Sequence, residues 1–132
     1  MTPSDDEAAK KPPVRVVIID DTLDVRMLLK LHLSLEDGIE VVDEGDDGAV
    51  AVALAAAHQP DVMILDQMMP KMTGIEALPL VREASPGCKV IVYSSRMADE
   101  TERAALKAGA DAYVEKIKGP DHIVDVIRSI TE

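Results

Sequence analysis

Short apolar runs alternate with longer stretches of helical periodicity along most of this 132-residue chain. The runs cover residues 14–20, 39–44, 61–65, 89–93 and 111–115. Each has the length of a β-strand. Residues 16–19, 62–65 and 90–92 are apolar without interruption, which is typical of parallel strands that helices cover on both faces. We expect these three segments to form the central strands.

Helical periodicity fills the intervals between the runs. Apolar residues recur at i, i+3, i+4 and i+7 in two of them: Val50, Ala53, Leu54 and Ala57, then Ile123, Val126, Ile127 and Ile130. Gly109 stands where a left-handed residue would end the fourth helix. Five strand–helix units joined by right-handed crossovers predict an α/β fold, an open parallel sheet with helices on both faces.

The chain is expected to form a single domain over residues 14–132. Its hydrophobic content of 47% is enough to fill one core. Residues 1–13 mix charges with three prolines and have no apolar periodicity, so we expect a flexible tail. No internal repeat or second domain is visible in the sequence.

Charge and composition argue against several classes of function. A formal net charge of -11 opposes attraction to nucleic acid and to anionic membrane surfaces. Cys88 is the one cysteine, and we expect a small buried apolar residue there. No apolar run approaches the length that crosses a bilayer, and no signal segment precedes the first strand. These features indicate a protein of the cytoplasm.

Carboxylates follow two of the expected central strands. Asp20 and Asp21 end the first run, and Asp66 follows the third. Parallel strands place their carboxyl ends at one edge of a sheet, where ligands bind. Like charges about 4 Å apart repel by about 4 kcal/mol at an effective dielectric constant near 20, so the cluster calls for a cation. Oxygen ligands without His or Cys favour Mg²⁺.

Other strand ends also carry reactive groups. Ser94 and Ser95 follow the fourth strand, and Glu115 and Lys116 end the fifth. Taken alone, Asp21 is equally well a helix cap and Asp66 a turn residue. Together these groups provide a nucleophile, a metal site, a hydrogen-bond donor and a fixed positive charge, which are the requirements of phosphoryl transfer to a carboxylate.

The sequence resembles the receiver domain of bacterial response regulators over residues 14 to about 131. The motifs that carry this resemblance are VVIIDD, MILDQMMPKMTGIEAL, VIVYSS and GADAYVEKI. The resemblance implies a flavodoxin-like sheet with strand order 2-1-3-4-5, as in the chemotaxis regulators. It also implies that the protein is a signalling switch of two-component phosphorelays. Such a switch assists its own phosphorylation and dephosphorylation and is not otherwise an enzyme.

The resemblance assigns roles to individual residues. It implies that Asp66 is the phosphoacceptor and that Lys116 pairs with the phosphoryl oxygens. Asp20, Asp21, Asp66 and the backbone carbonyl of Met68 would hold Mg²⁺, and no further cofactor is expected.

The resemblance also implies a switch and a set of partners. Ser94 matches the switch hydroxyl, and Tyr113 matches the aromatic residue whose orientation follows it. The fourth helix, fifth strand and fifth helix would then present the signal. The phosphoryl donor would be a histidine kinase or a histidine phosphotransfer protein, and the receiver of the signal a separate target or a fused output domain. A homodimer that depends on phosphorylation stays open.

Two departures from the family pattern stand beside the site. Ile117 replaces the Pro that often follows the conserved Lys, so we expect a trans peptide and a different local loop, with Pro120 in the first turn of the last helix. Met68 and Arg96 are expected to border the phosphoryl pocket, where Met68 replaces the usual polar residue and alters the lifetime of the phosphoryl group.

Two other functions fit the same fold. One is an interaction module that works without phosphorylation, although Asp20, Asp21, Asp66, Ser94 and Lys116 are all present. The other is a phosphohydrolase with an Asp nucleophile, which would need a second Asp at the position of Met68. A flavin site would need a phosphate-binding loop that residues 21–26 do not provide.

Overall fold

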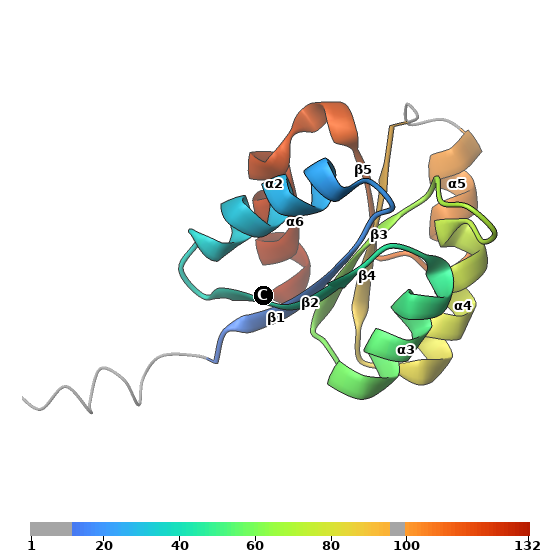
Figure 1. Cartoon of the computed structure of the whole chain (residues 1–132), viewed down its shortest axis with the longest axis horizontal. Helices are drawn as coiled ribbons and strands as arrows, with labels where there is room; N and C mark the ends of the chain where they lie inside the picture. The colour runs from blue at the N-terminus through green and yellow to red at the C-terminus, as the bar shows by residue number, and fades with distance from the viewer. Residues whose placement is uncertain (1–11, 96–99) are drawn as a thin grey trace, which may run out of the picture.

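A computed structural model describes residues 12–95 and 100–132 as a three-layer α/β/α structure (Figure 1). The strands are β1 (Val14–Ile19), β2 (Ile39–Gly45), β3 (Val62–Asp66), β4 (Lys89–Ser94) and β5 (Ala112–Glu115). The helices are α2 (Leu23–Ser34), α3 (Gly48–His58), α4 (Gly74–Ala84), α5 (Glu100–Lys107) and α6 (Pro120–Thr131), with a 3₁₀ turn η1 (Lys116–Lys118).

The five strands form one parallel sheet in the order β2-β1-β3-β4-β5. This order and every predicted strand are confirmed, with boundaries that differ from the predicted ones by one residue at most. Helices α2 and α6 cover one face of the sheet, and α3, α4 and α5 lie on the other (Figure 1). The predicted fold class is therefore confirmed.

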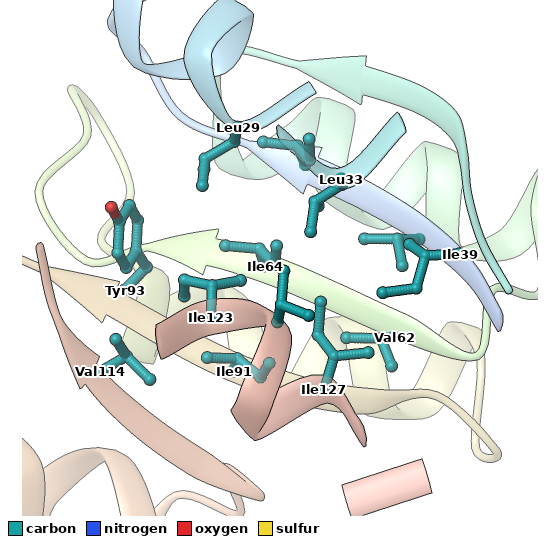
Figure 2. Close-up of a cluster of buried hydrophobic side chains, with 13 residues drawn as sticks. Leu29, Leu33, Ile39, Val62, Ile64, Ile91, Tyr93, Val114, Ile123 and Ile127 are labelled. Carbon is teal, nitrogen blue, oxygen red and sulfur yellow. The ribbon is translucent and has the colours of Figure 1, made fainter. Parts of the chain in front are cut away.

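Successive residues of the central strands point into two different cores. Val16, Ile18, Val62 and Ile64 join a cluster beneath α2 and α6, whose helical members include Leu29 and Ile127 (Figure 2). The residues between them, Val17, Ile19, Met63 and Leu65, join a second cluster beneath α3 and α4. The alternation of side chains along a strand explains why an uninterrupted apolar run is needed when both faces are covered.

The predicted helix around residues 50–57 is confirmed as α3, but not every residue of its apolar repeat is buried. The structure buries Gly48, Ala51 and Ala55 and leaves Ala53 and Ala57 exposed. The helix is apolar on nearly all sides, so periodicity alone does not identify the face that packs against the sheet. In α6, by contrast, the apolar repeat marks the core face, since Ile123 and Ile127 are buried and Val126 and Ile130 pack against the core.

Several local predictions are also confirmed. Cys88 is fully buried, and burial raises the pKa of its thiol to about 12. Gly109 has a φ of 109°, and Pro120 opens α6. The described residues contain no cis peptide, so the bond before Ile117 is trans. No helix within the described ranges is long and apolar enough to cross a membrane. Most of the predicted tail lies outside the described residues.

Candidate functional site

Three carboxylates meet at the carboxyl edge of the sheet. Asp20 and Asp21 directly follow β1, and Asp66 is the last residue of β3, the strand next to β1. One carboxylate oxygen from each residue lies within 4.8 Å of the other two. Asp20 and Asp66 are each 1% exposed, whereas Asp21 is exposed. The predicted meeting of these three acids is found in the structure.

Lys116 is the cation that faces this cluster. It opens η1 directly after β5, and its Nζ lies 2.8 Å from Asp20 Oδ2 and 3.1 Å from Asp66 Oδ1. The same ammonium lies 5.4 Å from the centre of the Tyr93 ring, a cation–π contact. One positive charge therefore bridges two buried negative charges, with Asp21 as a third acid beside them.

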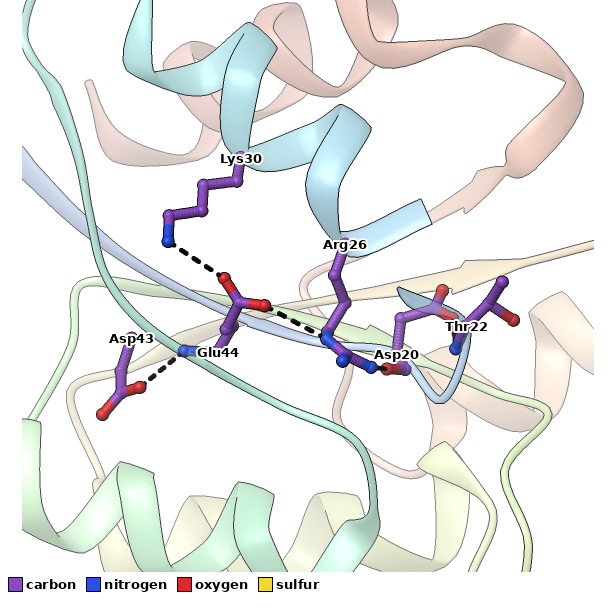
Figure 3. Close-up of polar contacts among 6 residues, drawn as sticks. All are labelled: Asp20, Thr22, Arg26, Lys30, Asp43 and Glu44. Carbon is purple, nitrogen blue, oxygen red and sulfur yellow. Dashed lines mark hydrogen bonds and ion pairs between the residues drawn. The ribbon is translucent and has the colours of Figure 1, made fainter. Parts of the chain in front are cut away.

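Asp20 is fixed through both its side chain and its backbone. Its Oδ1 accepts a 2.8 Å hydrogen bond from the amide of Thr22. Its own amide donates to the carbonyl of Gly45 in β2, at 3.1 Å. Its carbonyl accepts a 2.6 Å hydrogen bond from Nη1 of Arg26 (Figure 3). These bonds set the direction in which the carboxylate of Asp20 points.

The guanidinium of Arg26 is itself held by β2. Its Nε donates to Glu44 Oε1 at 3.2 Å, and the other oxygen of Glu44 pairs with Nζ of Lys30 at 3.3 Å (Figure 3). No spacing pattern in the sequence indicates this network, because Arg26 and Glu44 are 18 residues apart and on different elements. Spacing patterns detect pairs three or four residues apart on one helix, and only Arg26 and Lys30 have such a spacing here.

The loop after Asp66 is closely packed against that residue. The amide of Met68 donates to Asp66 Oδ1 at 3.2 Å. A Cβ on Gly74 would lie 2.5 Å from the carbonyl oxygen of Asp66, so this close approach requires glycine. Thr73 and Glu76 form a reciprocal capping box that starts α4 at Gly74. The loop thus returns to the strand end within eight residues.

The electrostatics of the cluster raise the proton affinity of Asp66. Burial, and next the charge of Asp20, raise the pKa of Asp66 from 3.8 to about 6, against the opposing effect of Lys116. Burial alone would lower the pKa of Lys116, but contact with Asp20 and the charge of Asp66 outweigh burial and raise it. The positive charge of Lys116 therefore does not fully offset the cost of ionising Asp66 at this buried position.

The acid cluster fits a hard divalent cation. Asp20 Oδ2 and Asp66 Oδ2 are buried and accept no hydrogen bond from any described residue, so the contact between Asp20 Oδ2 and Lys116 is an ion pair without hydrogen-bond geometry. Buried carboxylate oxygens without donors are suitable ligands for Mg²⁺, which binds one or two carboxylates and keeps several waters. Asp20, Asp21 and Asp66 are the residues that could supply them.

The remaining predicted residues lie in β4, β5 and η1 and in the loop after β3. Ser94 is fully buried at the end of β4, and Tyr113 is half-buried in β5. The side chain of Met68 is 44% exposed, and that of Ile117 is 89% exposed in η1. In register, Asp66 pairs with Tyr93, and Ser94 pairs with Glu115, the neighbour of Lys116. Arg96 lies outside the described residues.

The sheet order and the acidic carboxyl edge define the CheY-like class of the flavodoxin fold. The chain belongs to the response regulator receiver domain family, whose model matches residues 16–128. Receiver domains of this family are signalling switches of two-component systems. The resemblance inferred from the sequence motifs is therefore confirmed.

Individual relatives agree with this assignment. The chain is 35% identical to the response regulator protein VraR of Staphylococcus aureus over 115 residues, which are 87% of this chain and 55% of VraR. The signal receiver domain of the putative response regulator NarL from Mycobacterium tuberculosis superposes with a TM-score of 0.81 at 33% identity, over 89% of this chain and 98% of that one. A chain of the CheX-CheY-BeF3-Mg complex from Borrelia burgdorferi superposes with a TM-score of 0.84 at 26% identity, over 92% of this chain and 91% of that one.

The chain spans about half the length of the curated VraR relatives that it matches. The shared part is the receiver domain, so the comparison concerns this domain only.

Proposed function

We propose that this receiver domain accepts a phosphoryl group on Asp66 with the aid of Mg²⁺. The observation that carries the proposal is the meeting of three carboxylates at the carboxyl edge of the sheet, two of them paired with one ammonium, with a buried oxygen of Asp66 that has no donor. Such an arrangement is costly for folding alone and useful for binding a cation and a phosphoryl group.

The chain's own residues position the acceptor. The amide of Met68 and the ammonium of Lys116 both contact Asp66 Oδ1, which orients the carboxylate toward an in-line donor. A phosphohistidine donor loses its N–P bond as an Asp66 oxygen forms the new O–P bond, and the imidazole leaves. Lys116 then has a phosphoryl oxygen as an additional partner.

Asp20, Asp21, Asp66 and the carbonyl of Met68 would hold the metal. When bound, Mg²⁺ offsets the negative charge that develops on the transferring phosphoryl oxygens. The CheY structure whose name includes BeF3 and Mg supports this proposal by similarity of fold.

The readout proposed for this state uses Ser94 and Tyr113. A phosphoryl group on Asp66 adds strong acceptors near the end of β4, where Ser94 is buried. Its hydroxyl would move toward them, Tyr113 would follow, and the surface formed by α5, β5 and α6 would change. A histidine kinase or phosphotransfer protein would be the donor, and a separate target or a fused output domain would be the recipient.

Phosphorylation can be tested with a small-molecule donor. Incubation with acetyl phosphate and Mg²⁺, followed by intact-mass measurement, should add one phosphoryl group per chain. The group should be absent when Mg²⁺ is chelated and absent in Asp66→Asn. Asp61→Asn is the matched control, because Asp61 immediately precedes the same strand at its opposite end.

An unmodified wild-type chain in the presence of metal and donor would contradict the proposal. The protein would then be an interaction module that works without phosphorylation. Size measurement with and without beryllofluoride tests separately whether the activated state forms a homodimer.

A further inference from the structure

We infer that Arg26 is a positioning residue for the metal site, acting through the backbone of Asp20. This inference rests on one part of the proposed function, the binding of Mg²⁺ at the acid cluster. Nothing in the sequence motifs points to Arg26, and it contacts no carboxylate of the cluster. Its link to the site is the hydrogen bond from Nη1 to the carbonyl oxygen of Asp20 (Figure 3).

The bonded carbonyl belongs to the peptide that joins two expected metal ligands. The plane of the peptide between Asp20 and Asp21 sets the direction of both side chains, because the flanking backbone angles follow from it. The amide of Asp20 is already held by Gly45. With the carbonyl held by Arg26 as well, this segment of backbone cannot rotate without breaking a hydrogen bond on either side.

Arg26 can hold this carbonyl because Glu44 holds Arg26. The guanidinium is a planar group with several donors in fixed directions, so the bond from Nε to Glu44 also orients Nη1 toward Asp20. The side chain of Arg26 is 15% exposed, and that of Glu44 is 26% exposed. Glu44 is the neighbour of Gly45, so one short segment of β2 fixes both backbone groups of Asp20.

Charge alone predicts the opposite effect on metal binding. Arg26 is a positive charge close to a cation site, so its removal should strengthen Mg²⁺ binding if only long-range electrostatics counted. A positioning role predicts weaker binding, because the ligands lose their orientation. The sign of the change in affinity therefore separates the two roles.

Lys30 provides a matched control. It pairs with the same Glu44 and carries the same charge, but none of the described contacts of Lys30 reaches Asp20. Lys30→Met therefore removes one positive charge beside Glu44 and leaves the carbonyl contact of Asp20 in place. Arg26→Lys is the complementary variant, because it keeps the charge and loses the planar fork.

The experiment measures Mg²⁺ affinity by isothermal titration calorimetry in wild type and the three variants. We expect Arg26→Met to weaken binding by about tenfold, the range found when groups that orient metal ligands are removed. Lys30→Met should stay within about twofold of wild type or bind more tightly, since its charge is screened. Arg26→Lys should weaken binding by an intermediate factor, although its charge is unchanged.

A second measurement needs no metal. The amide of Thr22 donates to Asp20 Oδ1, so its hydrogen exchange reports how firmly the turn is held. In metal-free protein, exchange at Thr22 should be faster in Arg26→Met than in Lys30→Met, after correction for the free energy of unfolding of each variant.

Three outcomes decide the inference. Equal Mg²⁺ affinity in Arg26→Met and Lys30→Met, or tighter binding in both, would overturn it. If Arg26→Met fails to fold, Arg26→Lys carries the test, and wild-type affinity in that variant would overturn the inference. If wild type itself binds no Mg²⁺, the proposed function fails, while the exchange rate of Thr22 still tests whether Arg26 fixes the turn.

Discussion

The two ends of the sheet differ in how deeply acidic side chains are buried and in how many acids share one cation. At the amino end, Asp111 Oδ2 accepts hydrogen bonds from the amide of Val90 and from Arg82, and Asp61 Oδ2 accepts one from the amide of Arg15. At the carboxyl end, Asp20 and Asp66 also accept one backbone amide each, but they are more deeply buried, and their two charges share a single ammonium.

The amino end also joins separate elements. Arg82 on α4 donates to the carbonyls of Cys88 and Gly109 as well as to Asp111, so one side chain connects a helix, a loop and the start of β5. Each acid at the amino end therefore has its own donors, whereas the charge of Asp66 at the carboxyl end is disfavoured by burial and by Asp20. The carboxyl end, where this charge is disfavoured, is the one where ligands bind in open α/β sheets.

The first prediction concerns the closest backbone approach at the carboxyl end. Gly74→Ala should lower the free energy of unfolding by about 3 kcal/mol, because the new methyl group overlaps the carbonyl of Asp66 and the strand end must shift. Gly87→Ala is the control, since a Cβ there meets no atom within 4 Å. Urea unfolding measures both, and equal stability of the two variants would show that the loop after Asp66 is not tightly packed.

The second prediction concerns the amino end. Arg82→Met should lower the free energy of unfolding by about 2 to 3 kcal/mol, since two carbonyls and Asp111 lose a charged donor. Arg103→Met, at an exposed position on α5, controls for the loss of one positive charge. If the two variants had the same unfolding curve, the contacts of Arg82 would not stabilise the amino end, and this difference between the two ends would disappear.

The third prediction has the opposite sign. Because the pKa of Asp66 is about 6 in the fold against an ordinary 3.8, the folded state binds the proton more tightly than the unfolded state. The contribution of Asp66 to stability is thus most favourable below pH 4 and falls as the pH rises to about 6. In metal-free buffer at pH 7, Asp66→Asn should raise the free energy of unfolding by about 2 kcal/mol.

Asp66→Asn and wild type should become equally stable as the pH approaches 4. Asp61→Asn, at the other end of β3, should show no such gain at pH 7, because Asp61 is exposed to solvent whereas Asp66 is buried beside Asp20. A loss of stability in Asp66→Asn at pH 7 would mean that Lys116 compensates the acid cluster fully.

The fourth prediction concerns metal binding to the folded state. Mg²⁺ at ten times its dissociation constant should stabilise wild type by about 1.4 kcal/mol, because it binds the folded state alone. Thermal unfolding with and without the metal measures this gain, which should vanish in Asp20→Asn. The same stabilisation in Asp20→Asn would place the metal elsewhere.

The sequence predicted the carboxyl end better than the amino end, for a physical reason. Asp20, Asp66 and Lys116 follow strands directly, so strand length and parallel order alone bring them to one edge. The contacts of Arg82 and Arg26 depend on side chains that reach from one packed element to another. The periodicity of residues within a helix or strand does not predict such contacts. The sequence also left open that Lys116 would bridge Asp20 and Asp66 rather than stand apart from them.

Helix faces were predictable only where the pattern was amphipathic. In α6, charged and apolar residues alternate with helical spacing, and the buried face followed from them. In α3, small apolar residues occupy almost every position, so packing against the sheet selected Ala51 and Ala55. The confirmed strand order came from family resemblance, because several orders satisfy the same alternation of elements.

The contact between Lys116 and Tyr93 gives the molecule a built-in optical probe. The chain has two tyrosines and no tryptophan, so ultraviolet emission arises from Tyr93 and Tyr113 alone. Because the Tyr93 ring lies 5.4 Å from the ammonium, any ligand that draws Lys116 away should change the emission of that ring. Titrations of the unlabelled chain can therefore be followed by fluorescence, with Tyr93→Leu as the reference in which only Tyr113 emits.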